Sequence, residues 1–82
     1  MLFRSYLKLR VELPDTPGSL AGLTADLASV RANIHDISHD RRTKGLMIGA
    51  TAVQLLLETR GQEHTRDIIS YLQERGYSLE PA

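Results

Sequence analysis

Hydrophobic and polar residues alternate along the first part of the chain. From Tyr6 onward one face of the pattern carries Leu7, Leu9, Val11 and Leu13, and the other carries Lys8, Arg10 and Glu12. A period of two is typical of a β-strand with one face turned to water. Pro14 is expected to stop the strand, so the sequence predicts a strand over residues 6–13.

The hydrophobic spacing then changes to that of amphipathic helices. Over residues 17–31 a stripe with helical period is formed by Leu20, Leu23, Leu27 and Val30. A second helix is predicted over residues 62–75, burying Ile68, Ile69 and Leu72. Gly76 follows directly and is well placed to take the left-handed conformation that often ends a helix.

Three further strands are expected. Over residues 33–42 the pattern slips in phase, because Ile34 and Ile37 cannot both face a core in a regular strand, and a β-bulge near Asp36 is the simplest explanation. Residues 50–59 alternate between an apolar set and Gln54 and Glu58, with Gly49 before them and Gly61 after them; the apolar set is Val53, Leu55 and Leu57. Residues 77–80 form a short last strand.

This order of elements predicts one domain over residues 1–82 of the α+β class. A strand–helix–strand–strand–helix–strand chain with right-handed crossovers folds into a ferredoxin-like βαββαβ sandwich, with a four-stranded antiparallel sheet and two helices on one face. The other face is left bare and is mostly polar, so no partner is forced onto it. Its side chains are Lys8, Arg10, Glu12, Gln54, Leu56 and Glu58.

Residues 14–20 (PDTPGSL) join the first strand to the first helix and suggest a binding loop. Thr16 is a good N-cap, and Pro17 suits the first helical position. Gly18 removes a side chain, so the N–H groups of Gly18, Ser19 and Leu20 would point out of a helix N-terminus that favours a carboxylate. The alternative is that these residues only form the turn that ends the strand and starts the helix, and bind no ligand.

Composition narrows the possible functions. The chain has 82 residues, is 41% hydrophobic, and carries ten basic and ten acidic residues. Zero formal charge argues against a nucleic-acid binder, and we expect the local cluster of Arg41, Arg42 and Lys44 to be a solvated turn. A domain this small buries only about 60–65% of its unfolded surface, so a partner subunit would help it.

No segment of the sequence points to a membrane or to export. No apolar run approaches the 18 or so residues of a membrane span, and the N-terminus lacks the apolar core of a signal peptide. The sequence has no cysteine, which removes disulfides and thiol chemistry and fits the cytoplasm. We therefore expect a soluble, unprocessed cytoplasmic protein.

The histidines do not suggest a metal site. In a regular strand His35 and His39 would lie about 13 Å apart, too far to share one ion. We expect His39 to be half-buried and paired with a carboxylate such as Asp40 or Glu58, and His64 to be a surface residue. The sequence thus predicts no metal and no cofactor.

Nothing in the chain predicts catalysis or RNA binding. An acylphosphatase of this fold needs an arginine in the first loop, and none lies between Leu13 and Leu20. No Ser-His-Asp set or carboxylate pair is evident. A metallochaperone would need cysteine in that loop, and an RNA-binding module would need several aromatic residues where only Tyr6 is available.

Residues 11–20 (VELPDTPGSL), together with Asn33 and Ile34, resemble the ACT domain, a small amino-acid-sensing regulatory module. The resemblance covers nearly the whole chain. More narrowly, residues 32–34 (ANI), 39–41 (HDR) and 58–64 (ETRGQEH) are similar to the C-terminal ACT-type domain of threonine dehydratases, also called threonine ammonia-lyases.

The resemblance implies a non-catalytic domain that binds a free amino acid at a dimer interface. Isoleucine or valine would be the first choice of ligand and threonine or serine the second, and the positions implied are Asp15, Thr16, Gly18, Ser19, Leu20 and Asn33. The catalytic pyridoxal-phosphate domain of such an enzyme would lie outside this chain, which would be a regulatory fragment or a free-standing sensor. The alternative is a ligand-free dimerisation module with a decayed pocket. Either way we expect a homodimer or a higher homo-oligomer.

One departure from the family pattern concerns the end of the first helix. Many members have a glycine there, whereas this chain has Val30, Arg31 and Ala32. Ala32 or Asn33 would then have to take the left-handed conformation, or the helix must end differently. If Asn33 takes it, its side chain would serve the backbone instead of a ligand.

Overall fold

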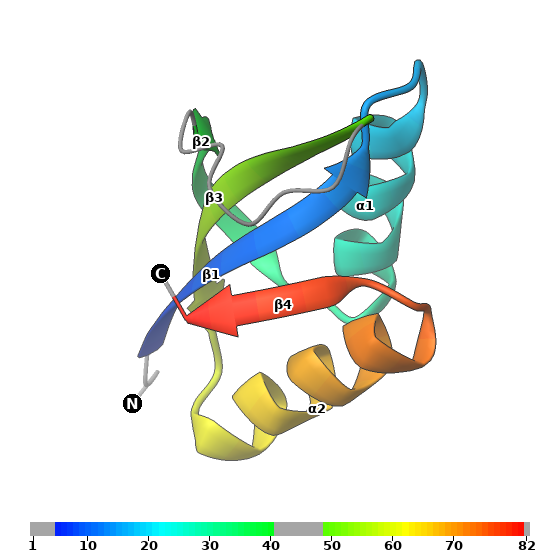
Figure 1. Ribbon diagram of the computed structural model, residues 1–82. Helices are drawn as coiled ribbons and strands as arrows, with labels where there is room; N and C mark the ends of the chain where they lie inside the picture. The colour runs from blue at the N-terminus through cyan, green and yellow to red at the C-terminus, as the bar shows by residue number, and fades with distance from the viewer. Residues whose placement is uncertain (1–4, 41–48, 82) are drawn as a thin grey trace.

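The computed structural model describes residues 5–40 and 49–81 and confirms the predicted βαββαβ order (Figure 1). The predicted basic cluster of Arg41, Arg42 and Lys44 lies outside the described residues. Within them, no helix is long and apolar enough to cross a membrane. The elements are β1 (Ser5–Pro14), α1 (Ser19–Ser29), β2 (Asn33–Asp40), β3 (Ala50–Thr59), α2 (Gln62–Glu74) and β4 (Ser78–Pro81).

The four strands form one antiparallel sheet in the order β2-β3-β1-β4. The central pair, β1 and β3, runs in unbroken register from Ser5 opposite Thr59 to Pro14 opposite Ala50. In β2 the register shifts between Ile34 and Asp36, which confirms the predicted bulge. The shift gives β2 one extra residue, so both isoleucines pack against the core.

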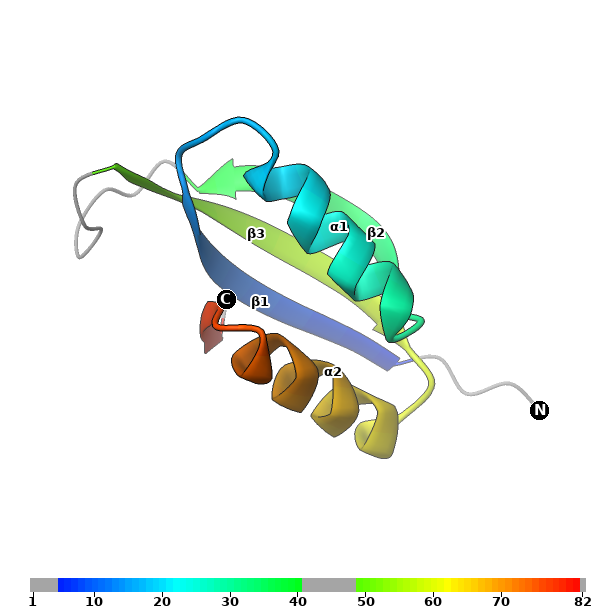
Figure 2. The same ribbon diagram turned by 90° about the vertical axis from the view of Figure 1, so that its right-hand side faces the viewer.

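Both helices cover the same face of the sheet, as predicted (Figure 2). In that view α1 runs along β2 and β3, and α2 runs beside β1. Between the layers lies a continuous aliphatic core made of Leu9, Val11, Leu13, Leu23, Leu27, Ala32, Val53, Leu55, Leu57, Ile68 and Leu72. Leu20 departs from the predicted stripe, because its side chain is 40% exposed.

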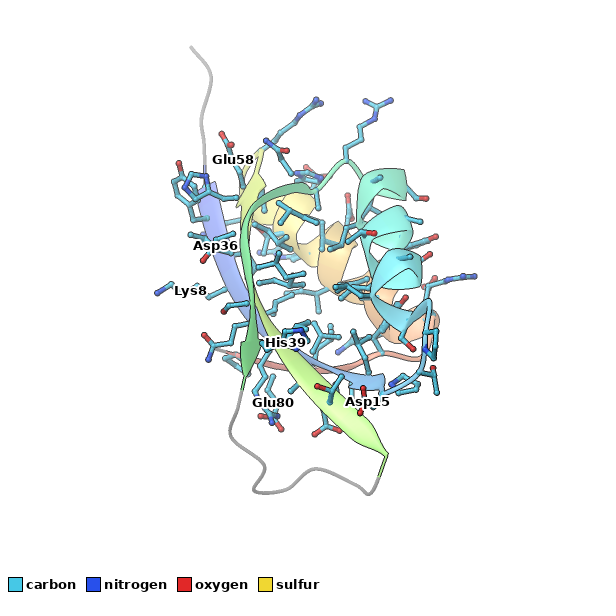
Figure 3. The ribbon with its side chains drawn as sticks, turned by 90° about the horizontal axis from the view of Figure 1, so that it is seen from above. Lys8, Asp15, Asp36, His39, Glu58 and Glu80 are labelled. Atoms are coloured by element: carbon cyan, nitrogen blue, oxygen red, sulfur yellow. The ribbon has the colours of Figure 1, made fainter. Side chains whose placement is uncertain are left out.

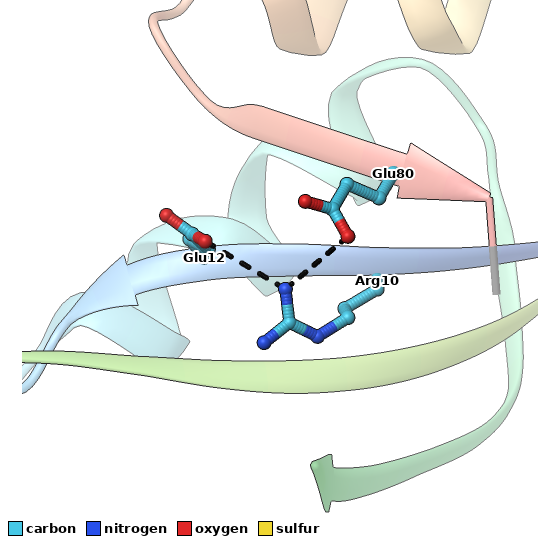
Figure 4. Close-up of polar contacts among 3 residues, drawn as sticks. All are labelled: Arg10, Glu12 and Glu80. Atoms are coloured by element: carbon cyan, nitrogen blue, oxygen red, sulfur yellow. Dashed lines mark hydrogen bonds and ion pairs between the residues drawn. The ribbon is translucent and has the colours of Figure 1, made fainter. Parts of the chain in front are cut away.

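The opposite face of the sheet is polar, but its central cation is buried. Arg10 is only 5% exposed. Its Nη1 lies 3.6 Å from Glu12 Oε1 in the same strand and 3.4 Å from Glu80 Oε2 in β4 (Figure 4). Since burying a charge is costly unless it is paired, these two carboxylates explain how an arginine is tolerated there. The face is therefore neutralised at its centre by groups of the same chain.

Both helices end in the same type of turn. After α1, the Arg31 N–H donates to Ala28 O and the Ala32 N–H to Leu27 O, and Arg31 has φ 60°. This is the Schellman pattern, in which the residue after the cap is left-handed. Of the two alternatives, a left-handed Ala32 or Asn33 is wrong, and the other is correct: the helix ends differently, with Arg31 left-handed.

At the end of α2 the prediction for the left-handed residue is correct. Gly76 has φ 92°, its N–H donates to Gln73 O, and the Tyr77 N–H donates to Leu72 O. A glycine adopts this conformation without the steric penalty that a side chain brings. The two helices therefore carry matched turns, one with the favoured residue and one with an arginine.

The buried carboxylate of Asp26 ties α1 to the segment after α2. The Tyr77 hydroxyl donates to Asp26 Oδ2 at 2.6 Å, and Arg75 Nε lies 3.3 Å from Asp26 Oδ1. Asp26 itself is 8% exposed. Burial of the Tyr77 hydroxyl, together with its hydrogen bond to the carboxylate, raises the pKa of Tyr77 to about 12. The pair thus fixes the C-terminal half of α1 to the segment between α2 and β4.

We expect Arg31→Gly to stabilise the protein by roughly 0.5–1 kcal/mol, because glycine removes the left-handed penalty at the end of α1. The matched change Gly76→Ala should destabilise it by about 1 kcal/mol, since it introduces the same penalty. Urea denaturation followed by circular dichroism measures both. Equal loss of stability in the two variants would contradict this account of the α1 turn.

Tyr77→Phe should lower the free energy of unfolding at pH 8 by about 2 kcal/mol, because a hydrogen bond to a charged group is lost. The pKa of Tyr77 is raised in the folded state, so its contribution is complete below pH 10 and is lost as pH rises toward about 12. The stability gap between the unaltered protein and the variant should therefore narrow over that window. A gap that stays constant in denaturant titrations up to pH 12 would show that the bond is not formed.

Candidate functional site

The segment between β1 and α1 is a tight turn, and a hydrogen bond to a residue outside the turn holds it in place. The Asp15 N–H donates to Gly49 O at 2.7 Å, which fixes the loop to the residue before β3. The Ser19 N–H donates to Thr16 O at 3.3 Å across Pro17 and Gly18. Gly18 has φ 88° and ψ −13°, the values of the third residue in a type II turn, whose second position favours proline.

The predicted capping of α1 by Thr16, with Pro17 in the first helical position, is wrong. The helix begins at Ser19, and Gly18 is its N-cap without any side-chain cap hydrogen bond. The Thr16 hydroxyl is instead hydrogen-bonded to the Ser19 hydroxyl at 2.9 Å. The physical reason is that Pro17 and Gly18 occupy the two central positions of a type II turn, so the helix can begin only after them.

Within the part of the chain that the structure describes, the N-terminus of α1 keeps free donors, although Ser19, one of the three predicted, is not among them. The N–H of Ser19 is used in the turn, and that of Gly22 makes the first helical bond, to Gly18 O at 2.9 Å. The N–H groups of Leu20 and Ala21 lie between them and have no partner inside a helix. Two donors and the positive end of the helix dipole form a place where a carboxylate is stabilised.

This N-terminus is open to solvent and has an apolar side chain next to it. Asp15, Thr16 and Gly18 are exposed, and apart from the two adjacent residues no atom of the described residues lies within 4 Å of where a Cβ would stand on Gly18. The 40% exposed Leu20 adds aliphatic surface beside the free N–H groups. Anion-binding donors beside an aliphatic side chain match the chemistry of an α-carboxylate with an aliphatic substituent.

Asn33 lies at the opposite end of the sheet. It begins β2, and its Nδ2 lies 3.4 Å from Glu58 Oε2 in β3. Glu58 pairs with Tyr6 near the start of β1, whereas the loop follows Pro14 at the end of β1. At about 3.3 Å per residue the two segments are about 26 Å apart. Figure 3 shows Glu58 and Asp15 at opposite ends of the molecule, so one chain does not bring the predicted site residues together.

Asn33 is not used as a helix cap. It has strand conformation, and its side chain reaches across to Glu58 instead of back to the end of α1. The concern that Asn33 would serve the backbone is therefore not supported, because Arg31 takes the left-handed position. The amide of Asn33 is exposed and points to a neighbouring strand.

Two of the three histidines, His39 and His64, differ from their predicted settings. His39 is exposed, so the expectation of a half-buried residue is wrong, because β2 lies at the edge of the sheet. His35 packs edge-on against Tyr6 with ring centroids 5.5 Å apart. In residues 5–40 and 49–81 no group of three or more His, Cys, Asp or Glu is placed to hold a metal ion.

His64 is not the plain surface residue that the sequence suggested. Its Nδ1 accepts a hydrogen bond from the Arg60 N–H at 2.9 Å, and its Nε2 lies 2.7 Å from Val30 O. The ring therefore connects the first turn of α2 to the end of α1, and the partner carbonyl is 34 positions away in the sequence. Only the folded structure could reveal that second contact.

Comparison of the sequence with known proteins finds relatives among one class of enzyme. The chain is 55% identical over 75 residues to L-threonine ammonia-lyase of Geobacter sulfurreducens, a match that covers 92% of this chain and 19% of the enzyme. It is 32% identical over 80 residues to L-threonine ammonia-lyase of Thermotoga maritima, covering 95% of this chain and 20% of the enzyme. The chain thus spans about a fifth of the length of the curated relatives it matches. No family model matches the sequence.

Comparison of the structure with solved structures identifies the fold. The ACT domain of GTP pyrophosphokinase from Chlorobium tepidum superposes with a TM-score of 0.71 at 15% identity, covering 98% of this chain and 100% of that one. An ACT domain protein from Streptococcus pneumoniae gives 0.59 at 16% identity, covering 92% and 84%. The chain therefore has the ACT-domain fold, and its sequence is similar to one segment of L-threonine ammonia-lyases.

Proposed function

We propose that this chain is a non-catalytic regulatory domain that binds a free amino acid between two copies of itself. The observation that carries the proposal is the open N-terminus of α1, with the unused N–H groups of Leu20 and Ala21 beside the exposed Leu20 side chain. The similarity to L-threonine ammonia-lyases supports it, since those enzymes act on an amino acid by name. Catalysis would belong to the part of such an enzyme outside the matched segment.

The ligand chemistry follows from the groups at the loop. The α-carboxylate would lie against the two free N–H groups, where the helix dipole stabilises negative charge. Leu20 favours an aliphatic ligand side chain, so isoleucine or valine is our first choice and threonine or serine the second. The ammonium group would be received by the carboxylate of Asp15 or by the amide oxygen of Asn33, with Thr16, Gly18 and Ser19 shaping the loop.

A second copy is needed because Asn33 and the loop lie at opposite ends of one chain. The edge strand β4 has four residues and ends at Pro81, which blunts pairing, whereas the edge strand β2 has eight residues and contains neither proline nor lysine. In the described part of the chain, no strand pairs with the outer side of β2. Antiparallel pairing of β2 with the same strand of a second copy would bring the second copy's Asn33 toward the loop end of the first, beside α1.

The first prediction is that isoleucine or valine stabilises the protein and that the protein is a dimer. Binding to the folded state alone raises its stability by RT ln(1 + [L]/Kd), about 2.7 kcal/mol when the ligand is at 100 times its Kd. Isothermal titration calorimetry and thermal denaturation with isoleucine, valine, threonine and serine measure the response, and sedimentation velocity measures the mass.

Three outcomes of this screen are informative. A dimer whose stability changes only with one of these amino acids supports the proposal and identifies the ligand. A dimer indifferent to all four at millimolar concentration favours a dimerisation module with a decayed pocket. A monomer both with and without amino acids would remove the shared pocket.

The second prediction tests whether the N-terminus of α1 receives the ligand carboxylate. Leu20→Glu adds an acidic residue to the first turn of α1, which suits the helix dipole but repels a ligand carboxylate, so binding should be lost without loss of stability. Leu20→Gln is the uncharged control. Gly18→Val is a poorer choice, because φ 88° at this residue would strain any β-branched side chain.

Mixing two defective chains should then restore binding. In a heterodimer of Leu20→Glu and Asn33→Ala chains, one of the two sites combines an intact loop with an intact Asn33. We expect calorimetry on the mixture, after exchange of subunits, to recover up to a quarter of the sites of the unaltered dimer, given about half heterodimers in a random mixture. A mixture that binds no better than either parent dimer would place each site within one chain.

A further inference from the structure

His64 has both ring nitrogens occupied by backbone groups of different elements. The Arg60 N–H can only donate, so Nδ1 must present its lone pair, and Nε2 must then carry the hydrogen that is given to Val30 O. Both bonds, at 2.9 and 2.7 Å, are therefore satisfied together only by the neutral ring with its hydrogen on Nε2. A protonated ring would turn an N–H toward the Arg60 N–H.

The carbonyl that His64 holds belongs to the turn at the end of α1. The last turn of α1 contains no basic residue to interact with its carbonyl groups. The carbonyls of Leu27 and Ala28 accept the N–H groups of Ala32 and Arg31, while that of Val30 faces His64. Because Arg31 is left-handed at φ 60°, its conformation costs free energy and must be maintained by contacts around it.

Asn33 begins β2 only three positions after Val30, so the turn sets the place from which its side chain extends. We propose that His64 is a positioning residue that holds the α1–β2 turn, and through it Asn33, in the geometry needed for ligand binding, and that it does so only as the neutral ring. The ligand part of this proposal rests on the proposed function; the holding of the turn does not.

The charged side chains around His64 are balanced in sign. The ring lies in an open pocket of about 480 Å³, whose lining includes two cations, Arg31 and Arg60, and two carboxylates of α2, Glu63 and Asp67. Since neither sign of charge prevails there, the two backbone hydrogen bonds of the ring hold the turn, and a hydrogen on Nδ1 would be incompatible with the bond from Arg60.

The first experiment needs no ligand. Long-range ¹H–¹⁵N spectra of the labelled protein at pH 7.5 should show His64 as the tautomer with hydrogen on Nε2. In His64→Ala, the amides of Arg31 and Ala32 should exchange with solvent about tenfold faster, because local opening becomes easier. The matched turn after α2 is an internal control, so the amides of Gly76 and Tyr77 should keep their protection. The other tautomer, or unchanged exchange at Arg31 and Ala32, would overturn the proposal.

The second experiment measures ligand affinity at pH 7.5 by calorimetry with isoleucine or valine. His64→Ala should bind about tenfold more weakly than the unaltered protein, because nothing holds Val30 O and the turn opens more easily. His64→Gln keeps a hydrogen-bonding side chain in the first turn of α2, so its affinity should fall by less than about threefold.

Controls separate His64 from its neighbours. Glu63→Gln alters the same pocket, and His39→Gln removes another imidazole ring, so both should keep the affinity of the unaltered protein. An affinity of His64→Ala equal to that of the unaltered protein would overturn the positioning role. If the unaltered protein binds none of the amino acids while the exchange results are as expected, the proposed function fails and the holding of the turn by His64 stands.

Discussion

The unbroken pairing of β1 with β3 is the constraint on which the rest of the structure depends. Ten consecutive residue pairs fix which side chains of both strands face the helices and which face outward. They also set the separation between the loop at the end of β1 and the start of β2, because α1 must run back along the sheet between them. A site that uses both Asp15 and Asn33 therefore cannot close within one chain, whatever the side chains do.

The sequence predicted the parts of the fold that depend on periodicity. The strand over residues 50–59 has the bounds expected from its alternation, and the bulge in β2 follows from two isoleucines that must both reach the core. The left-handed conformation of Gly76 was predicted correctly, because a glycine directly after an amphipathic helix commonly takes that conformation to end the helix. In each case the deciding physics is local, or is a burial pattern that repeats along the chain.

The features that the sequence did not predict depend on contacts between residues far apart in the sequence. The pair Pro17 and Gly18 suits a helix start and a type II turn equally well, and the bond from Asp15 to Gly49 O fixes the approach of the chain to that turn. Nothing local marks Arg31 as left-handed. His64 finds its second partner, Val30 O, on another helix. Sequence reasoning thus named the segments of the candidate site but not how they are held.

Both ends of α1 are determined by groups outside the helix, and this affects how two sites in the proposed dimer would influence each other. An 11-residue helix is a rigid element about 16 Å long. Its first turn would form one site, and the turn after it precedes the asparagine of the other site. A ligand that shifts the N-terminus of α1 must therefore either move that asparagine or strain the left-handed turn before it. Since packed elements move as units, the helix itself is the physical link between the two sites.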